Sequence, residues 1–326
     1  MRRHIITRQE FDRNELDCRK FILENGIISP SKGEKAINDL TRQLSYCLLK
    51  NGFMGRRFIS FLSDYIDGNI INVSFLIETG NYKWKSFIKE EYISLAQDLF
   101  HTRPVGLGSP NSACGEGEFM LLCLSPICKK PTRGDIQVNI NNSSYIVELK
   151  GENPRVTSSV LGSNFRRKTI DLCESFGLTP NTSTRGNILG VQLTSEGVIR
   201  EYWRKELSKL KIEDRFLFLS KWLQETGTFN EVESIESSHR ILQSGFIDTD
   251  ILKKEIIKYF FKHQVTVRHE FSNMAFFKNN DVKIITNDIN KFFRLVDDKQ
   301  IKPAGDYFRL NQSTNLAWYI DCGLDI

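Results

Sequence analysis

A pair of short apolar stretches joined by a polar turn is the feature that most restricts how this chain can fold. Between Ile136 and Ile140 apolar and polar residues alternate, which is the pattern of a strand with one buried face. Residues 141–144 read Asn-Asn-Ser-Ser, a composition typical of a tight turn, and residues 145–149 form a second apolar run. We therefore expect a β-hairpin, which commits part of the core to a sheet.

Charged residues stand at the open end of this hairpin. Asp135 precedes the first strand, and Glu148 and Lys150 lie near the end of the second. Because strand residues two apart face the same side, Glu148 and Lys150 project together, while Leu149 faces a packed layer. Pairing of the two strands can bring Asp135 alongside Glu148. Two carboxylates held close repel each other unless a cation lies between them.

This combination of side chains suits phosphodiester hydrolysis. Carboxylate oxygens are the ligands that Mg²⁺ and Mn²⁺ prefer. A lysine next to such a site can orient or deprotonate the attacking water. Zinc sites, nucleotide-binding glycine loops and hydrolase triads find no support, because no Cys, Gly, Ser or His spacing in the chain matches them.

The context of the hairpin resembles the PD-(D/E)XK nuclease superfamily. The pattern D-(x)12-E-x-K crosses the hairpin, an expected short helix bearing acidic residues precedes it, and an expected amphipathic helix at 157–176 follows it. The resemblance covers Gly115 to Phe176. Gly134 occupies the position where the family loosely keeps a proline.

The resemblance implies an α/β (α+β) fold with a restriction-endonuclease-like core, a central mixed β-sheet flanked by helices. It also implies Mg²⁺-dependent cleavage of DNA, with Mn²⁺ as a substitute ion. Carried onto this chain, it makes Asp135 and Glu148 metal ligands, with Leu149 lending its backbone carbonyl. Lys150 would serve the nucleophilic water.

An upstream helical acid joins the site in many members of this superfamily. Glu118 is the first choice for that catalytic and metal-binding role, with Glu116 as the alternative. Basic residues around the hairpin would supply a rim for the phosphate backbone. These are Lys129, Lys130, Arg133, Arg155, Arg166, Arg167 and Lys168.

The rest of the chain is expected to support this site. Residues 1–100 show helical periodicity and would form a helical N-terminal region that grips DNA or a second subunit. Residues 101–326 would form one nuclease domain with a helical insertion near 196–265. Further strands are expected as a hairpin at 274–286 and in three later segments. These segments are 292–296, 307–310 and 317–320.

The composition is compatible with a globular nucleic-acid-binding protein but does not by itself indicate one. The chain has 326 residues and a net charge of +5, which is mildly basic. Its seven cysteines include no C-x-x-C pair, as expected for reduced thiols in an intracellular compartment. The N-terminal residues lack the apolar run of a signal peptide and no stretch suits a membrane span, so we expect a cytoplasmic protein.

The sequence therefore favours a Mg²⁺-dependent DNA endonuclease of the restriction type, acting on double-stranded DNA. A homodimer would place two such sites on the two strands. A Holliday-junction or repair nuclease, or a phage-encoded one, is the first alternative. An inactive DNA-binding protein that keeps the fold is the second. The recognition sequence, the DNA form and an RNA substrate all remain open at this stage.

Overall fold

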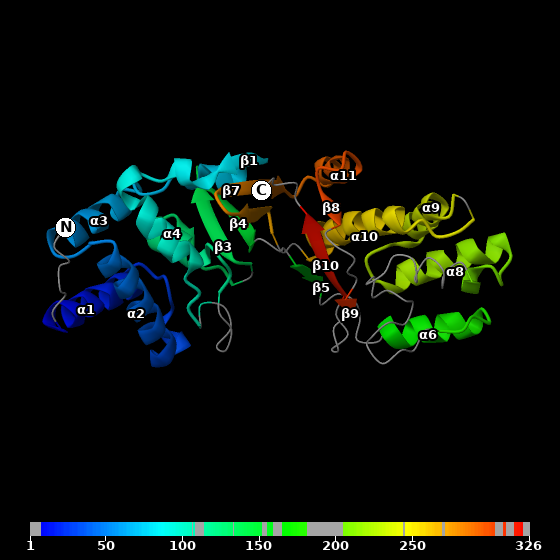
Figure 1. The fold of residues 1–326 in the computed structure, drawn as a ribbon, viewed down its shortest axis with the longest axis horizontal. Coiled ribbons are helices and arrows are strands. Elements are labelled where there is room, and N and C mark those ends of the chain that lie inside the picture. The colour runs from blue at the N-terminus through cyan, green and yellow to red at the C-terminus, as the bar shows by residue number, and fades with distance from the viewer. Residues whose placement is uncertain are drawn as a thin grey trace. The chain divides into compact units, whose positions relative to one another are not determined.

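The computed structural model of the chain describes residues 8–105, 107, 114–132, 134–151, 155–158, 165–180, 205–243, 245–268, 271–303, 309–310 and 316–321. It shows a mixed α/β protein that divides into two compact units (Figure 1). Unit 1 comprises Met1–Glu152 and Glu270–Asn287, and unit 2 comprises Asn153–His269 and Asp288–Ile326. Unit 1 thus combines the N-terminal helices with both expected hairpins.

A six-stranded mixed sheet lies at the centre of unit 1. Its strands, in spatial order, are β1 (Gly80–Lys83), β7 (Asp281–Thr286), β6 (Asn273–Lys278), β4 (Ser143–Lys150), β3 (Ile136–Ile140) and β2 (Cys128–Lys129). The β4–β6 pair is parallel, and the other neighbouring pairs are antiparallel. Both predicted hairpins, β3–β4 and β6–β7, are confirmed.

The turn between β3 and β4 fixes the register of the first hairpin. Asn141 and Asn142 have φ angles of 50° and 61°, so both adopt the left-handed conformation of a two-residue hairpin turn. Ile140 then pairs with Ser143, and Ile136 pairs with Val147. The second strand starts at Ser143, earlier than the sequence indicated, because the turn uses two residues.

Burial alternates along β4 as the sequence predicted. Val147 and Leu149 are buried in the core, whereas Glu148 and Lys150 are half-buried on the opposite face. In the parallel neighbour β6, Ala275 pairs with Leu149 and joins the same core. One face of the sheet therefore packs on helices, and the other carries the charged pair.

The core of unit 1 lies between this sheet and the N-terminal helices. These are α1 (Arg8–Glu24), α2 (Glu34–Lys50), α3 (Arg56–Ile66), α4 (Ile93–His101) and α5 (Glu118–Leu124). Leu40, Leu44 and Leu48 recur every four residues on α2 and are fully buried, as their spacing predicts. The indole of Trp84 donates to the carbonyl of Asn279 at 2.9 Å, which ties the N-terminal region to the β6–β7 turn.

Unit 2 is mainly helical. Its helices are α6 (Phe165–Ser175), α8 (Ile212–Glu225), α9 (Glu231–Ile241), α10 (Thr249–His263) and α11 (Ile289–Asp297). A small sheet joins β5 (Arg155–Ser158), β10 (Leu316–Asp321), β8 (Lys302–Pro303) and β9 (Arg309–Leu310). The helices expected within 196–265 are therefore present from residue 205 onward. Residues 196–204 lie outside the described residues.

Some element predictions were wrong. Residues 292–296 form part of helix α11 rather than a strand. The Asp288 side chain accepts from the Lys291 amide and starts this helix, and Phe292 and Val296 are buried one turn apart. A short apolar run does not by itself distinguish strand from helix. The helix expected from residue 157 is described from Phe165 onward, because residues 155–158 pair with β10.

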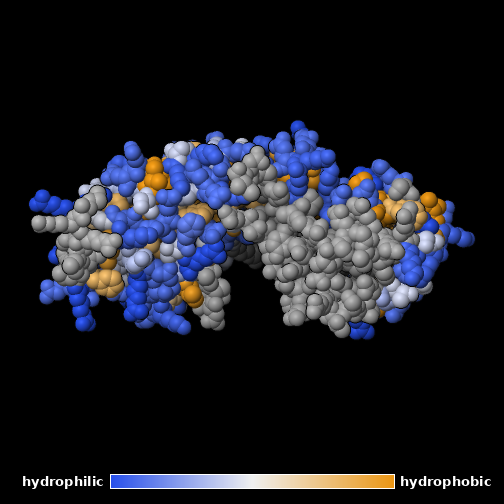
Figure 2. Space-filling model, in the orientation of Figure 1, coloured by the Kyte–Doolittle hydropathy of each residue, from blue (hydrophilic) through white to orange (hydrophobic). Residues whose placement is uncertain are grey.

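The N-terminal region expected to be helical is interrupted before α4. Two 3-10 turns, Trp84–Phe87 and Glu90–Tyr92, precede α4, and the short strand β1 was not foreseen. No helix in the described part of the chain is both long and apolar enough to cross a membrane. On the face visible in Figure 2, hydrophilic residues predominate among the coloured atoms, and hydrophobic ones occur in small groups.

Candidate active site

Three of the predicted site residues meet at the open end of the β3–β4 hairpin. Asp135 immediately precedes β3, and the register of the hairpin places it opposite Glu148. Oδ2 of Asp135 accepts a hydrogen bond of 2.8 Å from the Leu149 amide. The Lys150 ammonium forms an ion pair with Oε1 of Glu148. The acid, acid and lysine predicted from the sequence thus lie together on neighbouring strands.

The environment of Asp135 favours its protonated form. Burial raises the pKa of this carboxyl from 3.8 to about 7, and the negative charges of Glu148 and Glu118 act in the same direction. The Lys150 charge and the Leu149 amide oppose the rise. An acid that holds its proton near neutrality because of burial and like charge is a group that a nearby cation would ionise.

Glu118 is the first residue of α5, and its side chain is 3% exposed. Its Oε1 lies 2.6 Å from the Lys130 ammonium, and its Oε2 accepts from the Gly115 amide at 3.2 Å. The preceding residue, Gly117, has a φ of 79°, which starts the helix in a left-handed conformation. A carboxylate at this position is also favoured by the helix dipole.

Glu116 lies at the same open end of the hairpin, beside the residue that follows β4. It forms an ion pair with Arg103, and its carboxylate fills the space beside Gly151 that a Cβ atom would occupy. Gly151 directly follows Lys150, so Glu116 borders the end of β4. The two upstream acids therefore differ in their surroundings: Glu118 is buried against Lys130, and Glu116 is paired at the surface.

The basic residues predicted to contact the phosphate backbone differ in their surroundings. In unit 1, Lys129 donates to the carbonyl of Asn25, just beyond α1, at 3.1 Å, and Lys130 binds Glu118. Arg133 lies outside the described residues. These lysines therefore have intramolecular partners, and their ammonium groups are directed inward.

The remaining rim residues belong to unit 2. Arg155 lies in β5 and Arg166 in α6, with side chains outside the described part. Arg167 is exposed and lies 4.0 Å from Asp171, and Lys168 pairs with Glu225 at 2.5 Å. Exposed pairs of this kind contribute little to stability.

The residues present offer oxygen donors to a divalent cation. Asp135 and Glu148 supply carboxylates, and the Leu149 carbonyl follows in the chain. Within the described ranges, no group of three or more His, Cys, Asp or Glu side chains is arranged to hold a metal ion. Glu118 is paired with Lys130 and Glu148 with Lys150, and the side chain of Asp135 accepts from the Leu149 amide. A donor set made only of oxygen suits Mg²⁺ or Mn²⁺ and does not suit zinc.

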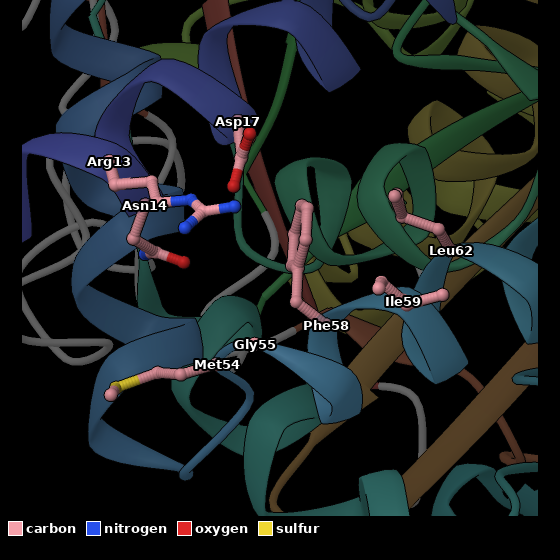
Figure 3. Close-up of a pocket in the computed structure, with 8 residues that line it drawn as sticks. All are labelled: Arg13, Asn14, Asp17, Met54, Gly55, Phe58, Ile59 and Leu62. Atoms are coloured by element: carbon pink, nitrogen blue, oxygen red, sulfur yellow. The ribbon is translucent and has the colours of Figure 1, made fainter. Parts of the chain in front are cut away.

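A separate pocket of about 570 Å³ opens between α1 and the start of α3 (Figure 3). Polar side chains of α1 line one side of it, and apolar side chains line the other. They are Arg13, Asn14 and Asp17, opposite Met54, Phe58, Ile59 and Leu62. Asp17 is the one carboxylate among these lining residues, and they include no lysine or histidine, so the hairpin remains the candidate site for hydrolysis.

Sequence reasoning missed the contact between Glu118 and Lys130. A charged residue opening a short helix whose other residues are all apolar is bound to be buried, and a buried carboxylate requires a partner. That signal was present in the sequence, and Lys130 was instead assigned to DNA.

No protein-family model, curated protein or solved structure matches this chain. Function therefore has to be inferred from the site itself.

Proposed function

We propose that this chain is a Mg²⁺-dependent DNA endonuclease of the PD-(D/E)XK type, most similar in design to restriction enzymes. The observation that carries the proposal is the hydrogen bond from the Leu149 amide to Asp135, which joins the first acid of the motif to the strand bearing Glu148 and Lys150. Three residues whose spacing matches the motif thereby share one end of a hairpin.

The fold supports this proposal. The sheet contains a parallel β4–β6 pair among antiparallel pairs, and the helix that begins with Glu118 packs against its β2 and β3 strands; both features are compatible with a restriction-endonuclease-like core. Unit 1 contains all four proposed site residues, Asp135, Glu148, Lys150 and Glu118. The helical unit 2 carries four of the seven proposed DNA-contact residues, as expected of a region that adapts such an enzyme to its substrate.

The roles of the side chains follow from their contacts. Asp135 and Glu148 would hold Mg²⁺, or Mn²⁺ in its place, with the Leu149 carbonyl. Mg²⁺, when bound, would neutralise charge on the scissile phosphate. Lys150, as an ammonium, would leave Glu148 to orient the attacking water. With all five charged groups ionised, the two lysines and three acids sum to −1, so a divalent cation would leave the site positive toward a phosphate.

A plasmid assay tests the proposal. Purified protein with Mg²⁺ should convert supercoiled double-stranded plasmid to discrete fragments, and EDTA should stop the reaction. Glu148→Ala and Lys150→Ala should each lower the cleavage rate at least 100-fold, the scale expected when a catalytic acid or base is removed. Lys83→Met is a matched control, because it removes a 2.6 Å ion pair with Asp281 from the same sheet. Equal loss in all three variants, or none, would argue against the site.

A second candidate function is supported by the lysine pairs. Because Glu148 and Glu118 are both already neutralised, the same geometry is compatible with a DNA-binding protein that keeps the fold without cleaving. Such a protein would retard DNA in a gel and leave the plasmid intact with Mg²⁺ or Mn²⁺. A resolvase or repair nuclease would instead cut branched DNA in preference to linear duplex.

A further inference from the structure

Lys130 has a position that a phosphate contact does not explain. Its side chain is 20% exposed, and its ammonium faces three oxygens. These are Oε1 of Glu118 at 2.6 Å, the Asp135 carbonyl at 3.2 Å and the Gly134 carbonyl at 3.5 Å. A lysine has three N–H donors, and the shortest of these three contacts is with the Glu118 carboxylate. The ammonium is therefore directed at groups of the protein itself.

The partners of Lys130 belong to two different parts of the site. Glu118 opens helix α5, and Asp135 opens the hairpin. Through one ammonium group, the helix that carries the upstream acid is joined to the backbone of the first motif acid. The second oxygen of Glu118 is held by the Gly115 amide, so the orientation of its carboxylate is fixed from both sides.

Gly134 makes this arrangement possible. Its φ is 82°, a conformation that a proline ring does not reach. The backbone before Asp135 can therefore turn so that two successive carbonyls face Lys130. The departure from the proline of the resembled motif thus coincides with the place where the chain accommodates a lysine.

We propose that Lys130 is a positioning residue: its ammonium holds Glu118 and the entrance of β3 together, so that Asp135 is fixed at the open end of the hairpin. The contact of Lys130 with Glu118 and the Asp135 carbonyl follows from the geometry alone. The purpose assigned to that contact rests on the proposed function. Lys130 acts through Glu118 and touches neither the phosphate nor the water.

Hydrogen exchange and metal binding test this role together. In Lys130→Met the Gly115 amide, which is bonded to Glu118, should exchange at least tenfold faster than in the wild type. The affinity for Mn²⁺, measured by calorimetry without DNA, should fall at least tenfold. DNA affinity in EDTA should stay within twofold. Lys130→Arg, which keeps the charge, should recover part of the Mn²⁺ affinity, and Lys83→Met should change none of these quantities.

A double-mutant cycle checks that Lys130 acts through Glu118. The variant Glu118→Gln/Lys130→Met should bind Mn²⁺ no more weakly than Glu118→Gln alone. Additive losses would overturn the inference. So would a loss of DNA affinity with a salt slope smaller by about 1 and unchanged Mn²⁺ binding, because that is the behaviour of a phosphate contact.

Failure of the two proposals can be told apart. If the wild type binds no Mn²⁺ and cuts no DNA, the proposed function fails, and exchange at Gly115 alone decides the inference about Lys130. Unchanged exchange in Lys130→Met overturns it. If Lys130→Met does not fold, the same comparison is made between Lys130→Arg and Glu118→Gln: faster exchange in Glu118→Gln alone supports the role, and equal exchange in both overturns it.

Discussion

Replacing Asp135 by asparagine tests whether burial and neighbouring charge hold a proton at the hairpin entrance. The folded-state pKa of about 7 lies about 3 pH units above the ordinary 3.8. At about 1.36 kcal/mol per pH unit this corresponds to about 4 kcal/mol. The side chain is half-buried, so solvent screening lowers the expected effect to about 2–4 kcal/mol.

The direction of this effect follows from the raised pKa. The folded protein binds the proton more tightly than the unfolded chain, so the stabilisation from Asp135 is complete below pH ~4 and disappears as the pH rises to about 7. Asparagine keeps an oxygen that can accept from Leu149 and never ionises. Asp135→Asn should therefore unfold at a higher urea concentration than the wild type at pH 8. At pH 4 the two proteins should nearly coincide.

Urea unfolding in EDTA at pH 4, 6 and 8 measures this difference. Asp12→Asn serves as the control, because Asp12 is a surface acid whose side chain is 64% exposed. The wild type should lose about 2–4 kcal/mol relative to Asp135→Asn between pH 4 and 8. Parallel pH profiles for the two proteins would refute the electrostatic account of Asp135. Adding Mg²⁺ at pH 8 should raise the stability of the wild type and leave Asp135→Asn unchanged.

Three further substitutions have defined outcomes. Leu149→Ala removes a side chain that is 4% exposed in the core and should lower the unfolding free energy by about 2–5 kcal/mol in urea titrations. Gly151→Ala should reduce the rate of plasmid cleavage and disturb the Arg103–Glu116 pair, because its new methyl group meets the Glu116 carboxylate; an unchanged rate would argue against Glu116 as the alternative upstream acid. Asn142→Val should lower the unfolding free energy by about 1–2 kcal/mol, since a β-branched residue is strained at a φ of 61°, whereas Asn142→Gly should be nearly neutral.

Local features of the fold were readable from the sequence, and non-local ones were not. Alternation from Ile136 to Ile140 and the Asn-Asn turn predict a hairpin because period and turn chemistry act over a few residues. The parallel pairing of Glu148 with Met274 joins residues separated by most of unit 2, and no local pattern encodes it. Residues 292–296 were misread as a strand because five apolar-rich residues fit the period of a strand as well as that of a helix. The signal that separates the two is Asp288, which caps the helix.

The candidate site divides in the same way. Asp135, Glu148 and Lys150 were identified together because one hairpin carries them all. The choice between Glu116 and Glu118 depends on how the chain turns at Gly117, whose left-handed conformation starts α5 and buries Glu118. That choice also decides the role of Lys130, whose burial depends on the acid it meets. The apolar residues that follow Glu118 indicate its burial, but its pairing with Lys130 is a consequence of packing α5 against the sheet and has no signal in the sequence spacing.

The register of β3 and β4 connects the turn to the proposed chemistry. A slip of one residue would reverse the faces of β4 and move Glu148 and Lys150 into the core, where two paired charges would replace Val147 and Leu149. It would also separate Asp135 from the Leu149 amide. The two left-handed asparagines oppose that slip at the far end of the hairpin. Asn142→Val should therefore lower Mn²⁺ affinity as well as stability, and an intact Mn²⁺ site in this variant would show that core packing alone sets the register.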